Sequence, residues 1–224
     1  MIIDNFDIIR NHLDFINTKL DRYVIHILRR PKDLTEDQKN LLGSNEAQRL
    51  IRTYYVDSIE YFDRKIPAIK ELCKANNARA YIIVQPKDNF ECLLNLGEKI
   101  FETIRNKNYS VKPEHLLRQA FCEWHKTRKK QWIIDLDEDD PNSMQGWTLE
   151  DVKKLVIEQL EEIGKDLNDM YVVQTPHGHH IVTSPFNLQS AFKKCNMMYE
   201  GLKDNKVGWL HKDGMTLLWA DVQK

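Results

Sequence analysis

The fold that this sequence predicts is decided by the stretch QWIIDLDEDD, residues 131–140. Its apolar start, Trp132 to Ile134, is typical of a buried strand, and the acids that follow are typical of a loop at the strand's end. Because side chains alternate between the two faces of a strand, Asp135 and Asp137 point the same way while Leu136 points into the other layer. The stretch therefore predicts a strand with two carboxylates on one face at its carboxyl end.

Helical and strand-like patterns interleave on both sides of this stretch. Before it, they predict a helix over 1–20, strands over 23–30, 49–56 and 79–85, a loop or short helix over 32–47, helices over 59–75 and 88–106, and a helix beginning at Pro113. After it, they predict a helix over 148–163, strands over 170–175 and 179–184, a helix over 187–198 and two short strands near the end. Such interleaving indicates α/β or α+β in one compact body. We expect α+β, with a mixed or antiparallel sheet flanked by helices and an elaborated N-terminal half.

The composition of the 224-residue chain excludes several classes of protein. No run of about 18 apolar residues is present, so we expect no membrane-spanning helix. The N-terminal residues mix acids with apolar side chains and lack a basic region and a small-residue cleavage site, so we expect no secretory signal and a cytoplasmic location. The four cysteines are widely spaced, which favours reduced core thiols over disulfides or a zinc site.

The net charge of −1 conceals two halves of opposite charge. Residues 1–134 hold 24 Lys and Arg against 18 Asp and Glu, and residues 135–224 hold 9 against 16. A basic binding surface beside an acidic metal site would produce this asymmetry, and so would simple drift in composition.

Asp135 and Asp137 are the first candidates for chemistry. Two carboxylates on one face at a strand's end suit Mg²⁺ or Mn²⁺, with substrate phosphates completing the coordination shell. Two ions about 3.5–4 Å apart would suit phosphoryl or nucleotidyl transfer. The D-x-D pattern alone is equally typical of a solvated acidic loop after a strand.

The second group of candidates lies in the turn Pro176–His177–Gly178 and the two residues after it, His179 and His180. A histidine behind a tight glycine turn projects over a sheet face, where it can contact a phosphate or transfer a proton. A zinc site made by the three histidines is the alternative, although no H-x₃-H spacing or cysteine supports it. Taken alone, the turn is better explained by exposed imidazoles and one buried, hydrogen-bonded histidine.

Basic side chains on or beside the predicted strands form a third set. The candidates for contact with a nucleic-acid backbone or other phosphates are Arg29, Arg30, Arg49, Arg52, Arg79, Lys129 and Lys130. Aromatic residues interleave with them and could stack on bases, although most are more simply core residues. A fourth candidate, Asp213, precedes the apolar run TLLWA and by itself is an ordinary turn residue.

The order of these motifs is more specific than any one of them. A strand ending in D-x-D is followed by a helix, a strand, a G-x-H turn into a further strand, and an Asp before a closing strand. This order resembles the catalytic core of the archaeo-eukaryotic primase superfamily, especially its small viral and plasmid primase-polymerase branch. The resemblance covers about residues 79–220 and is best over 131–185, and its G-x-H turn has one glycine fewer than the usual motif.

The resemblance implies an RRM-like catalytic core over residues 79–224, after an N-terminal helix and strand subdomain over 1–78. It implies catalytic roles for Asp135, Asp137 and His180, with Asp213 as a third ligand of Mg²⁺ or Mn²⁺. His180, His179 and Arg79 would bind the phosphates of the nucleotide. The implied activity is metal-dependent nucleotidyl transfer from a nucleoside triphosphate on nucleic acid, as in phage-type replication or repair.

Three other functions remain open from the sequence. The altered glycine turn is compatible with a catalytically inactive nucleotide- or nucleic-acid-binding protein on the same scaffold. The same carboxylates could serve a metal-dependent nuclease or phosphoesterase, with water as the nucleophile. A protein-interaction factor with no chemistry would use the acidic and basic halves to bind partners.

Overall fold

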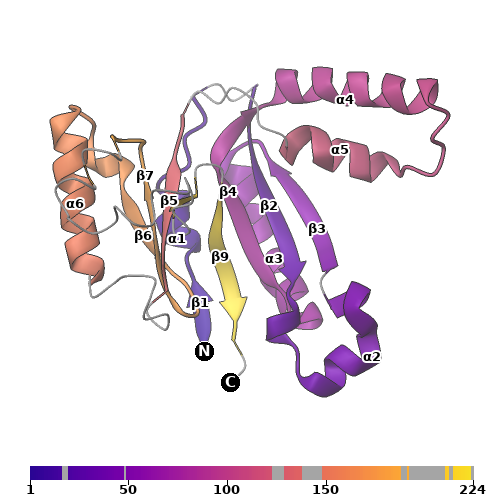
Figure 1. Ribbon diagram of the computed structural model, residues 1–224, viewed down its shortest axis with the longest axis horizontal. Helices are drawn as coiled ribbons and strands as arrows, with labels where there is room; N and C mark the ends of the chain where they lie inside the picture. Colours follow the sequence, from indigo (N-terminus) through magenta and orange to yellow (C-terminus); the bar gives the residue numbers. More distant parts are fainter. Residues whose placement is uncertain are drawn as a thin grey trace. The chain divides into compact units, whose positions relative to one another are not determined.

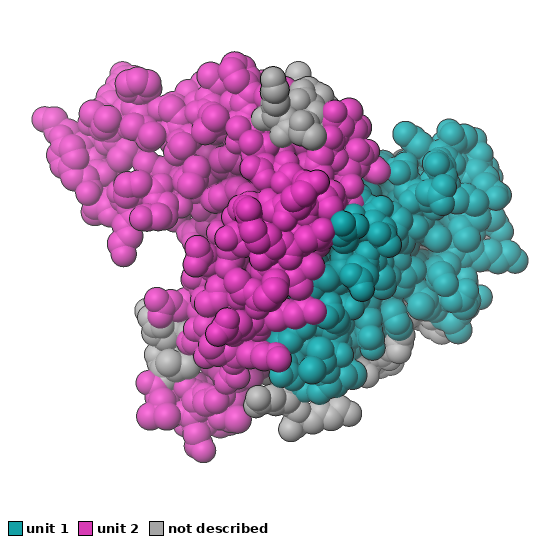
Figure 2. Space-filling view, turned by 180° about the vertical axis from the view of Figure 1, so that it is seen from behind, with its two compact units in different colours: residues 1–12, 130–224 teal, residues 13–129 magenta. Residues whose placement is uncertain are grey.

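The computed structural model describes residues 1–16, 20–47, 49–122, 129–137, 148–187, 191, 210–211 and 214–222. Within them the protein is α+β, with six α-helices and antiparallel sheets, as the sequence predicts (Figure 1). The chain divides into two compact units (Figure 2). Unit 1 comprises Met1–His12 and Lys130–Lys224, and unit 2 comprises Leu13–Lys129. The expected boundary between residues 78 and 79 falls inside unit 2.

Unit 2 is built on three antiparallel strands. The central strand β2 (Asp21–Arg29) pairs with β3 (Arg49–Val56) on one side and β4 (Arg79–Asp88) on the other. Helix α3 (Ile59–Asn76) packs across all three strands, and its first turn is capped by Ser58, whose Oγ accepts a hydrogen bond from the Tyr61 N–H. Because β4 pairs with β2, residues 79–88 belong with the N-terminal strands.

The sequence predicts that the third strand ends at Pro86, but β4 continues to Asp88. Proline has no N–H to donate, so it is tolerated where the ladder is irregular. The pairing of β4 with β2 shifts register between Arg22 and Val24, opposite this part of β4. The bulge therefore accommodates Pro86 without ending the strand.

Two helices follow β4 and lie side by side as a hairpin (Figure 1). They are α4 (Asn89–Arg105) and α5 (Pro113–Cys122), which begins at the predicted proline. Asp88 caps α4 by accepting hydrogen bonds from the N–H groups of Phe90 and Glu91.

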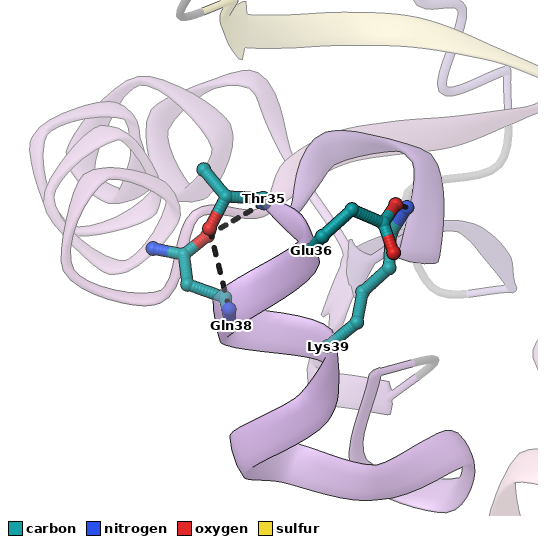
Figure 3. Close-up of polar contacts among 4 residues, drawn as sticks. All are labelled: Thr35, Glu36, Gln38 and Lys39. Carbon is teal, nitrogen blue, oxygen red and sulfur yellow. Dashed lines mark hydrogen bonds and ion pairs between the residues drawn. The ribbon is translucent and has the colours of Figure 1, made fainter.

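Between β2 and β3, the short 3-10 turn η1 (Pro31–Asp33) leads into helix α2 (Glu36–Ala47). Thr35 and Gln38 form a reciprocal capping box, in which each side chain bonds to the backbone N–H of the other (Figure 3). An ion pair between Lys39 and Glu36, with a 2.6 Å N···O distance, adds to this first turn. These local bonds define a helix where apolar periodicity is weak.

Unit 1 contains a four-stranded antiparallel sheet in the order β6 (Tyr171–Gln174), β7 (Gly178–Thr183), β5 (Trp132–Asp137), β8 (Leu210–His211). Helix α6 (Leu149–Glu162) covers one face of it. The core on that face joins Ile134 and Leu136 of β5 to Val156 and Leu160 of α6. A short 3-10 turn, η2 (Leu167–Asp169), connects α6 to β6.

The N-terminal residues of unit 1 do not form the predicted helix over 1–20. They form strand β1 (Ile2–Asp4), which pairs with β9 (Met215–Asp221), and the five-residue helix α1 (Phe6–Arg10). Ile3, Phe6 and Ile9 are all buried, as the predicted helix would require. The prediction was wrong because Ile3 is buried from a strand and only Phe6 and Ile9 from a helix.

Asn5 separates the two N-terminal elements and ties them to the rest of unit 1. Its Nδ2 donates to the carbonyls of Gln174 in β6 and Leu217 in β9, at 2.9 and 3.0 Å, and its Oδ1 accepts from the Gln174 N–H. A buried amide whose hydrogen bonds are made in this way stabilises one arrangement of these strands.

None of the described helices is long and apolar enough to cross a bilayer. The helix expected over 187–198 lies outside the described residues, apart from Asn187 and Ala191.

Candidate functional site

The two most specific motifs of the sequence meet on neighbouring strands of unit 1. Strand β5 pairs with β7 so that Asp135 stands directly opposite His180. The His180 Nε2 lies 3.1 Å from the Asp135 Oδ1, which is an ion-pair distance. Directly opposed residues share a face of the sheet, and this face is opposite to the one that carries Ile134 and Leu136 against α6. The fold therefore brings together two residues that are 45 positions apart.

The other ring nitrogen of His180 faces a buried hydroxyl. The His180 Nδ1 lies 2.9 Å from the Thr216 Oγ1, and Thr216 is a fully buried residue of β9. The imidazole therefore lies between a hydroxyl at Nδ1 and a carboxylate at Nε2. Thr216, His180 and Asp135 thus form a row that fixes the orientation of the imidazole and of the carboxylate.

The solvent exposure of this row rises toward the carboxylate. Thr216 is fully buried, the His180 side chain is 14% exposed and the Asp135 side chain is 31% exposed. Asp135 is therefore the member of the row most accessible to solvent, although its Oδ1, which faces His180, is buried. Carboxylates that bind a metal are commonly oriented by neighbouring polar groups in a similar way.

Asp137 lies on the same face as Asp135, two residues along β5. It stands opposite Gly178, which has no side chain to cover it, and it is half-buried. Two carboxylates on one face supply the oxygen donors that Mg²⁺ or Mn²⁺ prefers. Within the described part of the chain, no group of three or more His, Cys, Asp or Glu side chains is placed to hold a metal ion. Asp213, the expected third ligand, lies outside the described residues.

His179 lies on the other face of the sheet. It stands opposite Leu136 on one side and Gln174 on the other, so the pleat directs it to the side that α6 covers. The structure therefore separates His179 from His180, which the sequence grouped at one phosphate site. His177 is exposed in the turn before β7.

Arg79 belongs to unit 2 and is buried in an ion pair. Its guanidinium contacts the carboxylate of Asp33, in η1, which neutralises the charge that the sequence assigned to nucleotide phosphates. Breaking such a pair leaves an uncompensated buried charge, so the pair is part of the core of unit 2.

The other basic candidates also lie in unit 2, except Lys130, which begins the second segment of unit 1. Arg29 donates to the carbonyl of Asn76, and Arg30 donates to the hydroxyl of Tyr81. Arg52 lies over the ring of Tyr54, 4.9 Å from its centroid. Arg49 and Lys130 are exposed and Lys129 is partly buried. Arg29, Arg30 and Arg52, which the sequence assigned to a nucleic-acid surface, therefore make contacts within unit 2.

The charge asymmetry of the sequence follows the two units. Unit 2 carries 22 Lys and Arg against 16 Asp and Glu, and unit 1 carries 11 against 18, so their net charges are +6 and −7. The candidate carboxylates lie in the acidic unit and most of the basic candidates in the other.

Thr216 was missed by the sequence-based interpretation. It is the polar residue at the start of the apolar run TLLWA, 36 residues after His180. A hydroxyl at the start of a buried strand is a weak signal, because many such residues bond to nearby backbone.

Comparisons with protein-family models, with curated proteins and with solved structures found no match to this chain.

Proposed function

We propose that this protein is a divalent-metal-dependent nucleotidyltransferase of the primase-polymerase type, which acts on nucleic acid with a nucleoside triphosphate. The observation that carries the proposal is the cross-strand pairing of Asp135 with His180. In the resemblance these residues correspond to the D-x-D and G-x-H motifs. Such motifs act together only if their strands are neighbours, so this register supports the proposal.

The donor set fits a metal that is shared with a substrate. Mg²⁺ is commonly held by one or two carboxylates, with water and substrate phosphates completing an octahedral shell. Asp135 and Asp137 would supply those carboxylates, and Asp213 would add a third. When bound, the metal would neutralise charge on the triphosphate and on the pyrophosphate leaving group. In this proposal the sheet β6-β7-β5-β8 with α6 would serve as the RRM-like core.

His180 has a different role in this proposal from the one that the resemblance implies. Both of its ring nitrogens face protein groups, so it acts as a positioning residue that orients Asp135. Residues that support a metal ligand typically contribute about 10- to 100-fold to metal affinity or activity.

A primer-synthesis or extension assay with Mn²⁺ tests the proposal. We expect wild-type activity to be lost in the Asp135→Ala/Asp137→Ala variant and reduced about 10- to 100-fold in His180→Gln. The matched control is Glu158→Ala, which removes an exposed carboxylate of the same unit and should retain full activity. Synthesis that persists in the double variant would refute the proposal, and strand cleavage without pyrophosphate release would indicate a nuclease instead.

The second candidate is a catalytically inactive nucleotide- or nucleic-acid-binding protein. The row from Thr216 to Asp135 favours it, because a histidine held at both nitrogens does not face a substrate. This candidate predicts binding that falls with rising salt but is unchanged by a chelator and by Asp135→Ala. Binding that requires metal would exclude it.

A further inference from the structure

Helix α4 carries an apolar stripe that faces solvent. Six large apolar side chains of the helix are between 41% and 75% exposed. They are Phe90, Leu93, Leu94, Ile100, Phe101 and Ile104. Each of these positions lies three, four or seven residues from at least two of the others, so they share one face of the helix. We call this set the α4 stripe.

The α4 stripe is not the face that attaches the helix to its own unit. Cys92 is buried on the opposite side, where it packs with Leu117 and Phe121 of α5. In Figure 1 no described element of unit 2 lies beyond α4 on the side away from α5. A surface helix normally turns its apolar stripe toward the core, so an apolar stripe on the solvent side marks a surface for association.

Gly97 lies in the middle of the α4 stripe. A side chain added at Gly97 would meet no atom within 4 Å, so nothing inside this protein requires a glycine there. Glycine in a helix interior is unfavourable relative to alanine, by up to about 1 kcal/mol. Its presence at the centre of the stripe suits the close approach of a second helix, as small residues do where helices cross.

Exposed acids border one side of the α4 stripe. Glu91, Glu98 and Glu102 follow one another at intervals of seven and four residues along one flank. Exposed Arg105, seven residues after Glu98, ends the same flank, so three acids and one base give it a net charge of −2. This border stands out because unit 2 as a whole carries a net charge of +6. Charges beside an apolar seam decide which partner a helix accepts.

We propose that the α4 stripe is the docking face for an amphipathic helix of a partner protein, whose own apolar face is bordered by Lys or Arg. The apolar side chains would be buried against the partner helix, and the two helices would cross at Gly97. The three glutamates would favour a partner with basic side chains. An anionic membrane or a nucleic acid would be repelled by the acidic border. A second copy in an antiparallel pair centred on Gly97 would bring the two Glu98 side chains close together.

The test uses the full chain and two synthetic helical peptides with the same apolar face, one bordered by lysines and the other by glutamates. Fluorescence anisotropy should show that the lysine peptide binds at least about tenfold more tightly, which corresponds to about 1.4 kcal/mol. This binding should weaken as the salt concentration rises. Failure of both peptides to bind, or equal binding of the two, would overturn the proposal.

Variants locate the binding on α4. Leu94→Ser/Phe101→Ser should lose the lysine peptide, whereas Leu41→Ser, at an exposed leucine of α2, should bind it as the wild type does. Glu91→Lys/Glu98→Lys/Glu102→Lys should reverse the preference toward the glutamate peptide. Circular dichroism melts confirm that each variant is folded. Loss of binding in Leu41→Ser would refute the assignment to α4.

Two further measurements distinguish the proposed partner helix from the other possible occupants of the α4 stripe, a second copy of the chain and a membrane. Sedimentation equilibrium of the wild type should show no dimer that Leu94→Ser/Phe101→Ser disrupts, and flotation with anionic phosphatidylglycerol vesicles should leave the protein unbound. A stripe-dependent dimer would assign the surface to a second copy, and stripe-dependent vesicle binding would assign it to a membrane. Either result would overturn the proposed partner.

Discussion

At the scale of single residues, the buried His26 makes the stability of the protein depend on pH. It lies in the central strand of unit 2, where its Nδ1 is 3.0 Å from the Thr53 Oγ1. Burial, and to a smaller extent the positive charge of Arg118, lowers the pKa of His26 from 6.5 to about 4. The fold therefore holds this side chain neutral at pH values where the unfolded chain begins to protonate it.

We predict that stability falls as the pH drops from about 6.5 to about 4. In this window the unfolded chain binds a proton that the folded protein does not, so the contribution is fully present above the unfolded pKa and is lost at the folded one. The loss should be on the order of 3 kcal/mol. Urea unfolding at a series of pH values measures it in the wild type and in His26→Gln.

The variant isolates His26 from the carboxylates that titrate in the same range. The difference in unfolding free energy between the wild type and His26→Gln should change across the window. The same difference for Leu41→Ser, at an exposed residue that does not titrate, should stay constant. A pH-independent difference for His26→Gln would contradict the low pKa.

Individual residues could be predicted from the sequence where the chemistry was local to a motif. The alternation along WIIDLD predicted that Asp135 and Asp137 share a face, and β5 has that pleat. The partner of Arg79 could not be predicted, because Asp33 is 46 residues away and its position depends on how η1 returns to the sheet. For the same reason nothing in the sequence connected Thr216 to His180.

At the scale of elements, the hydrogen bonds that cap the N-terminus of α6 also change the pKa of one of the capping residues, Asp151. The Thr148 Oγ1 accepts from the Asp151 N–H, and the Asp151 Oδ2 accepts from both the N–H and the hydroxyl of Thr148. These hydrogen bonds favour the ionised carboxylate and lower the pKa of Asp151. The cap and the charge therefore support each other.

We predict that Thr148→Val raises the pKa of Asp151 back toward its ordinary value, because the hydroxyl that stabilises the carboxylate is removed. An NMR titration of the Asp151 side chain measures the shift. A carboxyl with a lowered pKa stabilises the fold above its unfolded pKa, and this support is lost as the pH falls through the folded value. Thr35→Val removes the comparable cap of α2 and should leave Asp151 unchanged. An unaltered titration in Thr148→Val would contradict the capping geometry.

Helices and strands could be predicted where the spacing of apolar residues was compatible with only one type of secondary structure. The long helices α3 and α4 and the strand β3 lie where periodicity and capping residues placed them. The N-terminal segment has two solutions, because a spacing of three residues suits a helix and also suits a strand followed by a turn of helix. Pairing with β9 and the bonds of Asn5 decide between them, and both come from the other end of the sequence.

At the scale of the whole molecule, unit 1 is assembled from both ends of the chain, with unit 2 between them. The sequence showed the charge asymmetry but not its topology, because a linear count cannot assign residues 1–12 to the acidic unit. The backbone N–H and carbonyl of Val222 bond to the carbonyl and amino group of Met1, at 2.8 and 2.7 Å. The pairing of β1 with β9 therefore joins the N-terminal segment of unit 1 to its C-terminal segment, and we call this pairing the closure of unit 1.

A disulfide across this ladder tests the closure. Ile2 stands directly opposite Asp221 and both are exposed, so Ile2→Cys/Asp221→Cys should form an intramolecular disulfide on mild oxidation. Because the disulfide closes nearly the whole chain into a loop, it should stabilise the protein by about 2–4 kcal/mol. Urea unfolding with and without reductant measures this gain, and non-reducing gels confirm a monomer. Asp4→Cys/Asp221→Cys is the matched control, because Asp4 stands opposite Trp219 and the diagonal separation exceeds the reach of a disulfide. Equal cross-linking of the two pairs would show that the N-terminal strand does not hold this register, and that unit 1 is closed in another way.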